Sequence, residues 1–304
     1  MRADLLPEGI IPALVTPFRD DRFDRALFER SIERLNSTGV AGYVALGSTG
    51  EGVLVSDDEA EEVIATAASA RGEGLVLIAG TGRESTRSTI ALTRRAAKAG
   101  AEAVLVKPPS YYKGAMTDSA LARHFRAVAD ASEVPVILYH IPRLAPVTFS
   151  PRLVLELAAH PNIVALKDTS GDLAFLSTVL RERPRGFRVY VGSASQLLVS
   201  LVLGADGGIH ALANIAAREC VALWKLVRER GDLASARELQ LRLVPINQAV
   251  TIRFGVPGLK KAMELLGLES SEPRPPLEPI AESSVAELRA IVEASGLIKA
   301  MGGA

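Results

Sequence analysis

Eight short aliphatic runs, separated by helical segments, constrain the fold of this 304-residue chain more than any other feature. Three of them follow a glycine that ends a helical stretch, as in "NSTGVAGYVALG", "AKAGAEAVLVKP" and "LVLGADGGIHAL". Such a glycine fits the position just after a helix, where a positive φ is favoured. The runs lack polar alternation, which is typical of parallel strands buried on both faces. The expected strands are Ile10–Val15, Gly42–Leu46, Leu75–Ala79, Ala103–Val106, Val136–Tyr139, Ile163–Leu166, Arg188–Val191 and Gly207–Ile209.

The segments between these runs have the spacing of amphipathic helices. Asp24–Thr38 is one example, with Asp24 able to cap its first turn. Strand–helix alternation repeated eight times predicts an α/β fold, and about 250 residues is typical of a (β/α)8 TIM barrel. A doubly wound open sheet is the alternative. The chain has no G-x-G-x-x-G after its first strand, which weakens a dinucleotide-binding version of that alternative.

The pattern of strands stops after about residue 214, and only helices are expected beyond it. A proline-rich connector, "SSEPRPPLEP", cannot form regular helix. We therefore expect a catalytic barrel over residues 1–230 and a small all-helical C-terminal region over residues 231–304. The expected C-terminal helices are Ile215–Arg230, Asp232–Thr251, Gly258–Leu266 and Ser284–Ala294.

Charge and cysteine content narrow the class of protein. Thirty-five basic residues balance 35 acidic ones, which gives no support for nucleic acid or an anionic membrane as a partner. The single cysteine, Cys220, excludes an intrachain disulfide and suits a reducing compartment. The N-terminal "MRADLLPEGIIP" lacks the apolar core of a secretory signal, and no run of about 18 apolar residues is present. We expect a cytoplasmic protein.

In a barrel, reactive side chains lie where strands end. Lys167 follows a buried run, and burial disfavours the ammonium form and lowers a lysine pKa. A neutral amine can form a Schiff base with a ketone. Tyr139 ends the preceding strand, where a phenol can shuttle protons. "GSTGE" (Gly47–Glu51) offers main-chain N–H groups and two hydroxyls suited to holding a carboxylate.

Each of these features also has a purely structural interpretation. Lys107 ends a strand in the same way as Lys167, and the residues alone do not separate the two lysines. Tyr139 could be a core tyrosine. "GSTGE" could be a plain turn in which Glu51 accepts main-chain hydrogen bonds, and His140 could simply pack. No metal site is expected, because the histidines at positions 124, 140, 160 and 210 show no ligand spacing.

The motifs "GSTGE", "YHIP" and "ALKDTSGD", in this order, resemble those of the dihydrodipicolinate synthase/N-acetylneuraminate lyase family. The resemblance extends from "GIIPALVTPF" to the C-terminal helices. It implies a (β/α)8 barrel and a class I, pyruvate-dependent lyase or aldolase. It also implies covalent imine chemistry without a metal or organic cofactor, and a homotetramer built as a dimer of dimers.

The resemblance also implies roles for individual residues. Lys167 matches the Schiff-base lysine and Tyr139 the proton-shuttling tyrosine. Ser48 and Thr49 match hydroxyl positions that bind the pyruvate carboxylate, with Gly47 beside them. Tyr112 matches a relay tyrosine that the family supplies to a neighbouring subunit, or Tyr111 does so if the register is shifted by one residue. The Ile209 carbonyl matches a contact to the pyruvyl group, and Gly192 and Ser193 are candidate substrate contacts.

Departures from the family pattern bear on the substrate. Dihydrodipicolinate synthases have an arginine five residues after the catalytic tyrosine, where this chain has Leu144 with Arg143 one residue earlier. Sialic acid lyases carry an acidic pair where this chain has Ala194 and Ser195, which disfavours a sugar polyol. Arg143 and Thr169 are the candidates for the far end of the substrate.

Longer stretches such as "HPNIVALKDTSGD" and "RFGVPGLKKAMELLG" most resemble the 4-hydroxy-2-oxoglutarate aldolase subgroup. We expect an aldolase acting on a 4-hydroxy-2-oxo acid, such as 4-hydroxy-2-oxoglutarate or a 2-keto-3-deoxy sugar acid. The alternative is a dihydrodipicolinate synthase that condenses pyruvate with aspartate semialdehyde. A more remote alternative is a non-catalytic 2-oxo acid binding protein.

Overall fold

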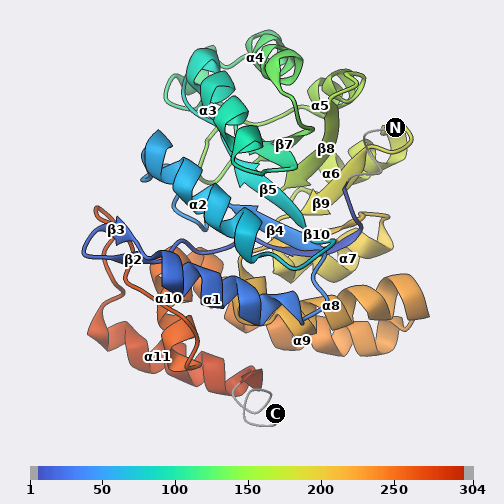
Figure 1. Ribbon diagram of the computed structural model, residues 1–304. Helices are drawn as coiled ribbons and strands as arrows, with labels where there is room; N and C mark the ends of the chain where they lie inside the picture. The colour runs from blue at the N-terminus through green and yellow to red at the C-terminus, as the bar shows by residue number, and fades with distance from the viewer. Residues whose placement is uncertain (1–5, 298–304) are drawn as a thin grey trace.

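The computed structural model describes residues 6–297, which form a barrel of eight parallel strands surrounded by helices (Figure 1). The strands are hydrogen-bonded in the order β1-β10-β9-β8-β7-β6-β5-β4, and a bridge between Ala13 and Val44 joins the two ends. The expected (β/α)8 fold is therefore confirmed. The strands are β1 (Gly9–Pro12), β4 (Gly42–Ala45), β5 (Val76–Gly80), β6 (Ala103–Val106), β7 (Val136–His140), β8 (Ile163–Asp168), β9 (Arg188–Val191) and β10 (Gly207–His210).

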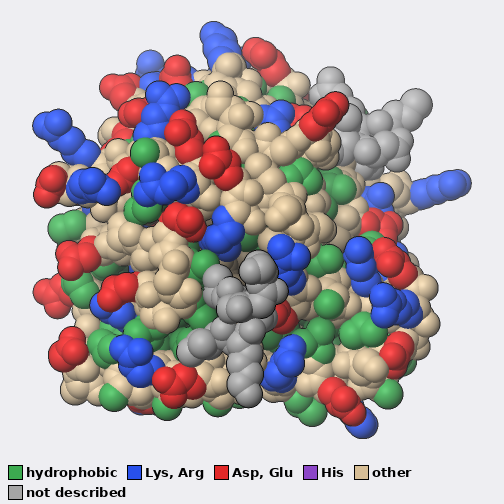
Figure 2. Space-filling model, turned by 60° about the horizontal axis from the view of Figure 1, so that its bottom comes forward, with side chains coloured by type: hydrophobic (Ala, Val, Ile, Leu, Met, Phe, Trp, Pro, Cys, Tyr) green, Lys and Arg blue, Asp and Glu red, His purple; other side chains and the backbone are tan. Residues whose placement is uncertain are grey.

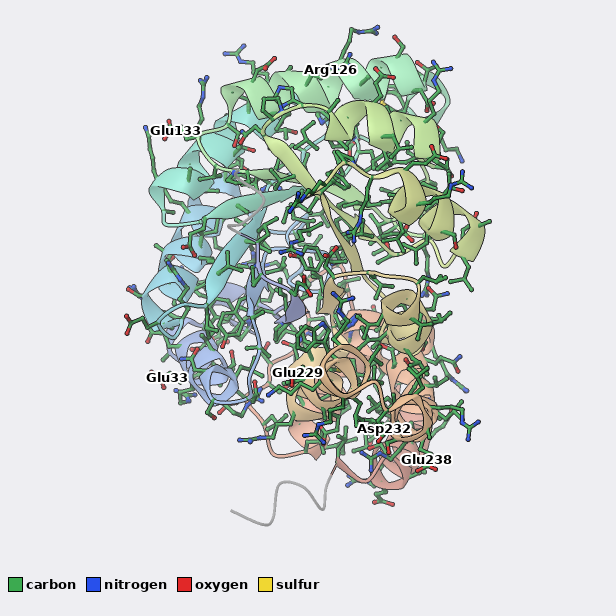
Figure 3. The ribbon with its side chains drawn as sticks, turned by 90° about the vertical axis from the view of Figure 1, so that its right-hand side faces the viewer. Glu33, Arg126, Glu133, Glu229, Asp232 and Glu238 are labelled. Atoms are coloured by element: carbon green, nitrogen blue, oxygen red, sulfur yellow. The ribbon has the colours of Figure 1, made fainter. Side chains whose placement is uncertain are left out.

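Helices follow the strands in turn and begin where the sequence provides caps. Side chains of Asp24, Ser85 and Thr117 each accept a main-chain N–H of the helix that they precede. The helices lie outside the barrel, and charged side chains such as Glu33 and Arg126 point outward at the periphery (Figure 3). These helices are α1 (Arg25–Asn36), α2 (Asp57–Ala70), α3 (Thr86–Lys98), α4 (Asp118–Ala131), α5 (Pro151–Ala158), α6 (Leu173–Glu182), α7 (Leu197–Val202) and α8 (Ala217–Lys225).

Apolar side chains fill both faces of the sheet. One cluster of buried residues, which includes Ile11, Val44 and Ile137, packs inside the barrel. A larger cluster packs between the strands and the surrounding helices. The strands are therefore buried on two sides, which explains why the aliphatic runs show no polar alternation.

The structure differs from the sequence expectation at several element boundaries and in one added element. Strand β1 ends at Pro12 and not at Val15, and the helix expected over 215–230 is divided into α8 and η5 (Leu226–Arg230). Strand β8 continues through Asp168, so Lys167 lies within the strand and not after it. A hairpin of β2 (Phe18–Arg19) and β3 (Arg22–Phe23) was not expected. Its turn residues, Asp20 and Asp21, both have positive φ, as two-residue hairpin turns require. Strands of two residues are too short to show a periodic pattern, which is why the sequence did not indicate them.

The C-terminal region is helical, as expected, and lies below the barrel in the view of Figure 1. Gln240 ties it to the barrel, since its side chain accepts from Leu198 N–H and donates to the Ala194 carbonyl (both 2.9 Å). Gly231, with a φ of 63°, ends η5 and separates it from α9. The elements are η5 (Leu226–Arg230), α9 (Leu233–Gln248), η6 (Ala249–Arg253), α10 (Gly255–Leu265) and α11 (Glu282–Ala294).

The surface agrees with the balanced composition. Figure 2 shows basic and acidic side chains interspersed over the face that carries the C-terminal helices, without a field of one sign. Among residues 6–297, no helix combines the length and apolar character needed to cross a membrane.

Candidate active site

Lys167 and Tyr139 lie next to each other inside the barrel. They are register partners on β8 and β7, so both side chains leave the sheet on the same face. The Lys167 Nζ is 4.2 Å from the centre of the Tyr139 ring. Only 3% of Lys167 and 5% of Tyr139 is exposed to solvent. The strand register thus brings together the two residues that the sequence placed on neighbouring strands.

Burial prepares the Lys167 amine for nucleophilic attack. It lowers the pKa of Lys167 to about 7, because the ammonium form loses its hydration inside the barrel. Within residues 6–297, no carboxylate or hydrogen-bond acceptor contacts Nζ to restore that loss. A large fraction of the amine is therefore neutral at neutral pH, as Schiff-base formation requires.

The structure also distinguishes Lys167 from Lys107, which the sequence did not. Lys107 Nζ forms an ion pair with Glu84 Oε1 at 2.8 Å. Glu84 in turn accepts the main-chain N–H groups of Ser110 and Tyr111, and these donors together with Lys107 hold the pKa of Glu84 at about 2. Burial acts in the opposite direction on Glu84 and is the largest single influence. Lys107 is thus a partner of a carboxylate, whereas Lys167 is a buried amine without one among residues 6–297.

Tyr139 can carry a proton as a neutral phenol. Burial raises the pKa of Tyr139 to about 12, and the contact with Ser48 acts weakly in the opposite direction. The Tyr139 hydroxyl is 3.4 Å from Ser48 Oγ, so the two groups form a short chain of exchangeable protons. A phenol that stays protonated at neutral pH can donate to and accept from neighbouring oxygens in turn.

The Gly47–Gly52 loop presents unused main-chain N–H donors beside the Tyr139–Ser48 pair. Its turn is closed by hydrogen bonds from Gly50 and Gly52 N–H to the Gly47 carbonyl (3.1 and 3.2 Å). In the described part of the chain, the N–H groups of Ser48 and Thr49 donate to no acceptor. Two adjacent free N–H groups and two hydroxyls are suited to a carboxylate. A small cavity lined by Gly47, Ser48, Leu105 and Tyr139 lies against this loop.

Two glycines let this loop pack closely. A Cβ at Gly52 would lie 2.2 Å from the Leu46 carbonyl oxygen, and one at Gly80 would lie 2.1 Å from the same atom. Any side chain at either position would push the loop away from the barrel.

Other residues singled out from the sequence are engaged in the scaffold. The Thr169 hydroxyl donates to the His140 carbonyl at 2.6 Å, and Gly192 N–H donates to the Asp168 carbonyl at 2.6 Å. Ser193 Oγ is 3.5 Å from the Asn247 amide nitrogen. Ile209 is buried on β10 opposite Ile11.

Arg143 lies in a different environment from the one expected. Its guanidinium donates to the carbonyls of Thr251 (3.1 Å) and Ile252 (2.7 Å) in the C-terminal region. Leu144, which occupies the family's arginine position, is 64% exposed. Two of the five N–H donors of Arg143 thus bind η6, which anchors the guanidinium at the C-terminal region.

Tyr111 and Tyr112 lie on the loop that follows β6. They are 80% and 73% exposed, and their rings pack edge to face with centres 5.0 Å apart. Exposed aromatic side chains on a loop held by Glu84 are available to a second copy of the chain.

His140, for which the sequence suggested only a packing role, directly follows Tyr139 on β7. Its Nδ1 is 2.8 Å from Asp168 Oδ1, and its Nε2 accepts the Phe149 N–H at 3.2 Å. Since Nε2 is an acceptor, we assign the proton to Nδ1, which donates to Asp168. His140 and Asp168 each follow a reactive residue and are register partners themselves. Their adjacency to Tyr139 and Lys167 was the signal that could have revealed this pair.

Comparison with known proteins places this arrangement in a family. A sequence model described as the dihydrodipicolinate synthetase family matches residues 6–295. The chain belongs to this family. Its members are aldolase-type lyases that act on pyruvate through a Schiff base with a lysine, so the chain is a carbon–carbon lyase.

Relatives and solved structures of the family cover nearly the whole chain. A 4-hydroxy-tetrahydrodipicolinate synthase of an Exiguobacterium species is 37% identical over 94% of this chain and 97% of its own length. One of Methanoculleus marisnigri is also 37% identical, over 94% of this chain and 98% of its own. The Acinetobacter baumannii dihydrodipicolinate synthase complexed with pyruvate is 32% identical, with a TM-score of 0.90 over 95% of this chain and 99% of its own. The family is thus confirmed, while these relatives carry the name of the synthase and not that of the aldolase.

Proposed function

We propose that the chain is a class I aldolase that cleaves or forms a 4-hydroxy-2-oxo acid, with Lys167 as the Schiff-base residue. The observation that carries this proposal is the buried Lys167 amine, which has a pKa of about 7 and lies 4.2 Å from the centre of the Tyr139 ring. Family membership supports the same chemistry, because its enzymes form a lysine–pyruvate imine.

The reaction follows from this arrangement. The neutral Lys167 amine attacks the C2 ketone, and loss of water from the carbinolamine gives a protonated imine. The imine accepts the electron pair of the C3–C4 bond as that bond breaks, and an enamine forms. The proton of the C4 hydroxyl passes to the Tyr139–Ser48 chain, and an aldehyde departs. Protonation of the enamine at C3 and hydrolysis of the imine then release pyruvate and the free amine.

The loop that carries Ser48 and Thr49 would hold the C1 carboxylate. The Ser48 hydroxyl is 3.4 Å from the Tyr139 hydroxyl, and both residues line the same small cavity. The free N–H groups of Ser48 and Thr49 are adjacent in this loop. Gly47 closes the loop, and the Ile209 carbonyl and the Gly192–Ser193 turn are further proposed contacts. A carboxylate fixed at this loop would direct C2 toward the amine.

The distal half of the substrate distinguishes the two candidate reactions. An aspartate semialdehyde substrate has a carboxylate and an amine to bind, and this chain has Leu144 at the arginine position of the family. Arg143 is held by the carbonyls of Thr251 and Ile252. Both observations weaken the case for aspartate semialdehyde. They fit a 2-keto-3-deoxy sugar acid, whose distal half has no carboxylate, while 4-hydroxy-2-oxoglutarate is supported by the resemblance of longer sequence stretches to its aldolase.

The second candidate is 4-hydroxy-tetrahydrodipicolinate synthase. Its support comes from the relatives, since two synthases so named are 37% identical to this chain over 94% of its length. The imine and enamine are shared by both reactions. The two reactions differ only in the aldehyde with which the enamine reacts.

We also propose that the chain assembles as a homotetramer. Exposed apolar side chains lie on α7 (Val199 and Val202), at its C-cap (Leu203) and on α9 (Leu233 and Leu241), and these two helices contact each other. Such a patch is typical of a protein–protein interface. On another face, the exposed Tyr112 or Tyr111 would extend the proton relay of a neighbouring copy.

The test of the chemistry is borohydride reduction in the presence of pyruvate, followed by peptide mass analysis. We expect a reduced pyruvyl adduct on the peptide that contains Lys167, and its absence would refute the mechanism. A turnover screen of 4-hydroxy-2-oxoglutarate, 2-keto-3-deoxygluconate, and aspartate semialdehyde with pyruvate then decides the substrate. A clear preference for aspartate semialdehyde would overturn the aldolase assignment in favour of the synthase.

A further inference from the structure

Glu51, the last residue of "GSTGE", points away from the proposed carboxylate site. It is buried and adopts a positive φ of 55°, which a non-glycine residue rarely does. Its Oε1 is 2.5 Å from Nζ of Lys260, a buried lysine on α10. The ammonium of Lys260 stabilises this oxygen both by its charge and by a side-chain hydrogen bond. The loop is therefore joined to the C-terminal region by a buried ion pair.

Lys260 also binds the segment that follows β1, which contacts the loop through Thr16. Its ammonium donates to the main-chain carbonyls of Thr16 (2.9 Å) and Glu272 (3.0 Å). The Thr16 hydroxyl donates in turn to the Gly50 carbonyl at 2.7 Å. One lysine thus reaches two consecutive residues of the loop, Glu51 directly and Gly50 through Thr16.

Arg274, in the connector between α10 and α11, completes the attachment. Its main-chain N–H donates to Glu51 Oε2 at 2.7 Å. Its guanidinium is held by Asp21 (2.8 Å) and Glu59, and it lies 4.2 Å from the centre of the Phe18 ring. Figure 1 shows α10 and this connector close to the β2–β3 hairpin, in agreement with these contacts. Both carboxylate oxygens of Glu51 are therefore bound by residues of the C-terminal region.

Stability alone does not explain such an arrangement. Charges lose their hydration on burial, and a well-packed apolar pair is often as stable as a buried ion pair. Burial indeed lowers the pKa of Lys260, while the charge of Glu51 acts in the opposite direction. What an ion pair provides, and an apolar contact does not, is one defined position for the Glu51 carboxylate and hence for the main chain before it.

We infer that Lys260 and Arg274 are positioning residues that hold Glu51 and thereby orient the Ser48 and Thr49 donors toward the substrate carboxylate. This inference rests on the proposed function, in which that loop binds the carboxylate of pyruvate. On this inference the C-terminal region supports the pyruvate site through Glu51.

The test uses the exchange of pyruvate methyl protons with D2O, followed by NMR on the full chain. This half-reaction needs the imine and the proton relay but no aldehyde. The double variant Glu51→Gln/Lys260→Met removes both charges of the pair and so leaves neither of them buried alone. We expect its half-saturating pyruvate concentration to rise about tenfold, because small misplacements of binding groups have effects of that order or larger. The maximal exchange rate should change less than the half-saturating concentration, because Lys167 and Tyr139 are unchanged and only Ser48 of the relay lies on the displaced loop.

A matched control is Glu269→Gln, which removes the 2.9 Å ion pair between Glu269 and Arg34. That pair also joins the barrel to the C-terminal region, but it does not touch the loop, so half-saturation should match the wild type. An unchanged half-saturation in the folded double variant would overturn the inference, as would an equal shift in the control. If the double variant does not fold, Glu51→Gln alone decides, with a rise supporting the inference and no rise overturning it. Absence of exchange in the wild type would refute the proposed function instead.

Discussion

The pH dependence of imine formation gives the sharpest test of the buried lysine. Burial lowers the pKa of Lys167 from 10.5 to about 7, and only the neutral amine attacks the ketone. At about pH 7 roughly half of the Lys167 amine is neutral, whereas the neutral fraction of a solvated lysine would be about a thousand times smaller. The lowered pKa thus supplies about three orders of magnitude in reactive amine at neutral pH.

The shape of the profile follows from the same value. With a pKa of about 7, the neutral fraction falls about tenfold between roughly pH 8 and pH 6, and changes little above about pH 8. An unshifted lysine would lose about a hundredfold over the same interval and would show no plateau below about pH 11. Tyr139 does not interfere, because its pKa of about 12 keeps the phenol protonated throughout.

The assay is rapid mixing of enzyme with pyruvate, a timed quench with borohydride, and measurement of the adduct by intact mass. We expect the initial trapping rate to rise with pH and to level off near pH 8. A rate that continues to rise in proportion to hydroxide through pH 9 would show that the amine is not shifted. The reasoning from burial to reactivity would then be refuted.

Three further variants test other parts of the site. Lys167→Met should abolish trapping and should raise the melting temperature more at pH 6 than at pH 10. The pKa of Lys167 is lower in the folded than in the unfolded chain, so the buried lysine destabilises the wild type by up to about 5 kcal/mol. This destabilisation is complete below about pH 7 and disappears as the pH rises toward 10.5. An equal shift at both pH values would contradict this. Tyr139→Phe should lower kcat about a hundredfold or more while the borohydride adduct still forms, and unchanged turnover would exclude the relay. Arg143→Ala should leave kcat/KM within about twofold, because the guanidinium binds main-chain carbonyls; a larger loss would restore it as a substrate ligand.

Much of this protein follows from local patterns in the chain. The eight aliphatic runs predict a parallel barrel because strands buried on both faces leave no room for polar alternation. The helix boundaries follow from capping side chains such as Asp24 and Ser85, which act within one turn. Lys167 and Tyr139 are identifiable because barrel strands deliver their terminal residues to one face.

Other properties depend on contacts between residues that are distant in sequence, and only the tertiary structure decides them. Lys107 and Lys167 look alike in the sequence, and Glu84 beside one of them separates the two. The turn at Arg143 appeared to face the pocket, but carbonyls in η6 hold that guanidinium. Glu51 could not be matched to Lys260 from the sequence, because helix α10 reaches the loop only when the C-terminal region packs against the barrel. Charge pairing and desolvation depend on distance in space, which no local pattern encodes.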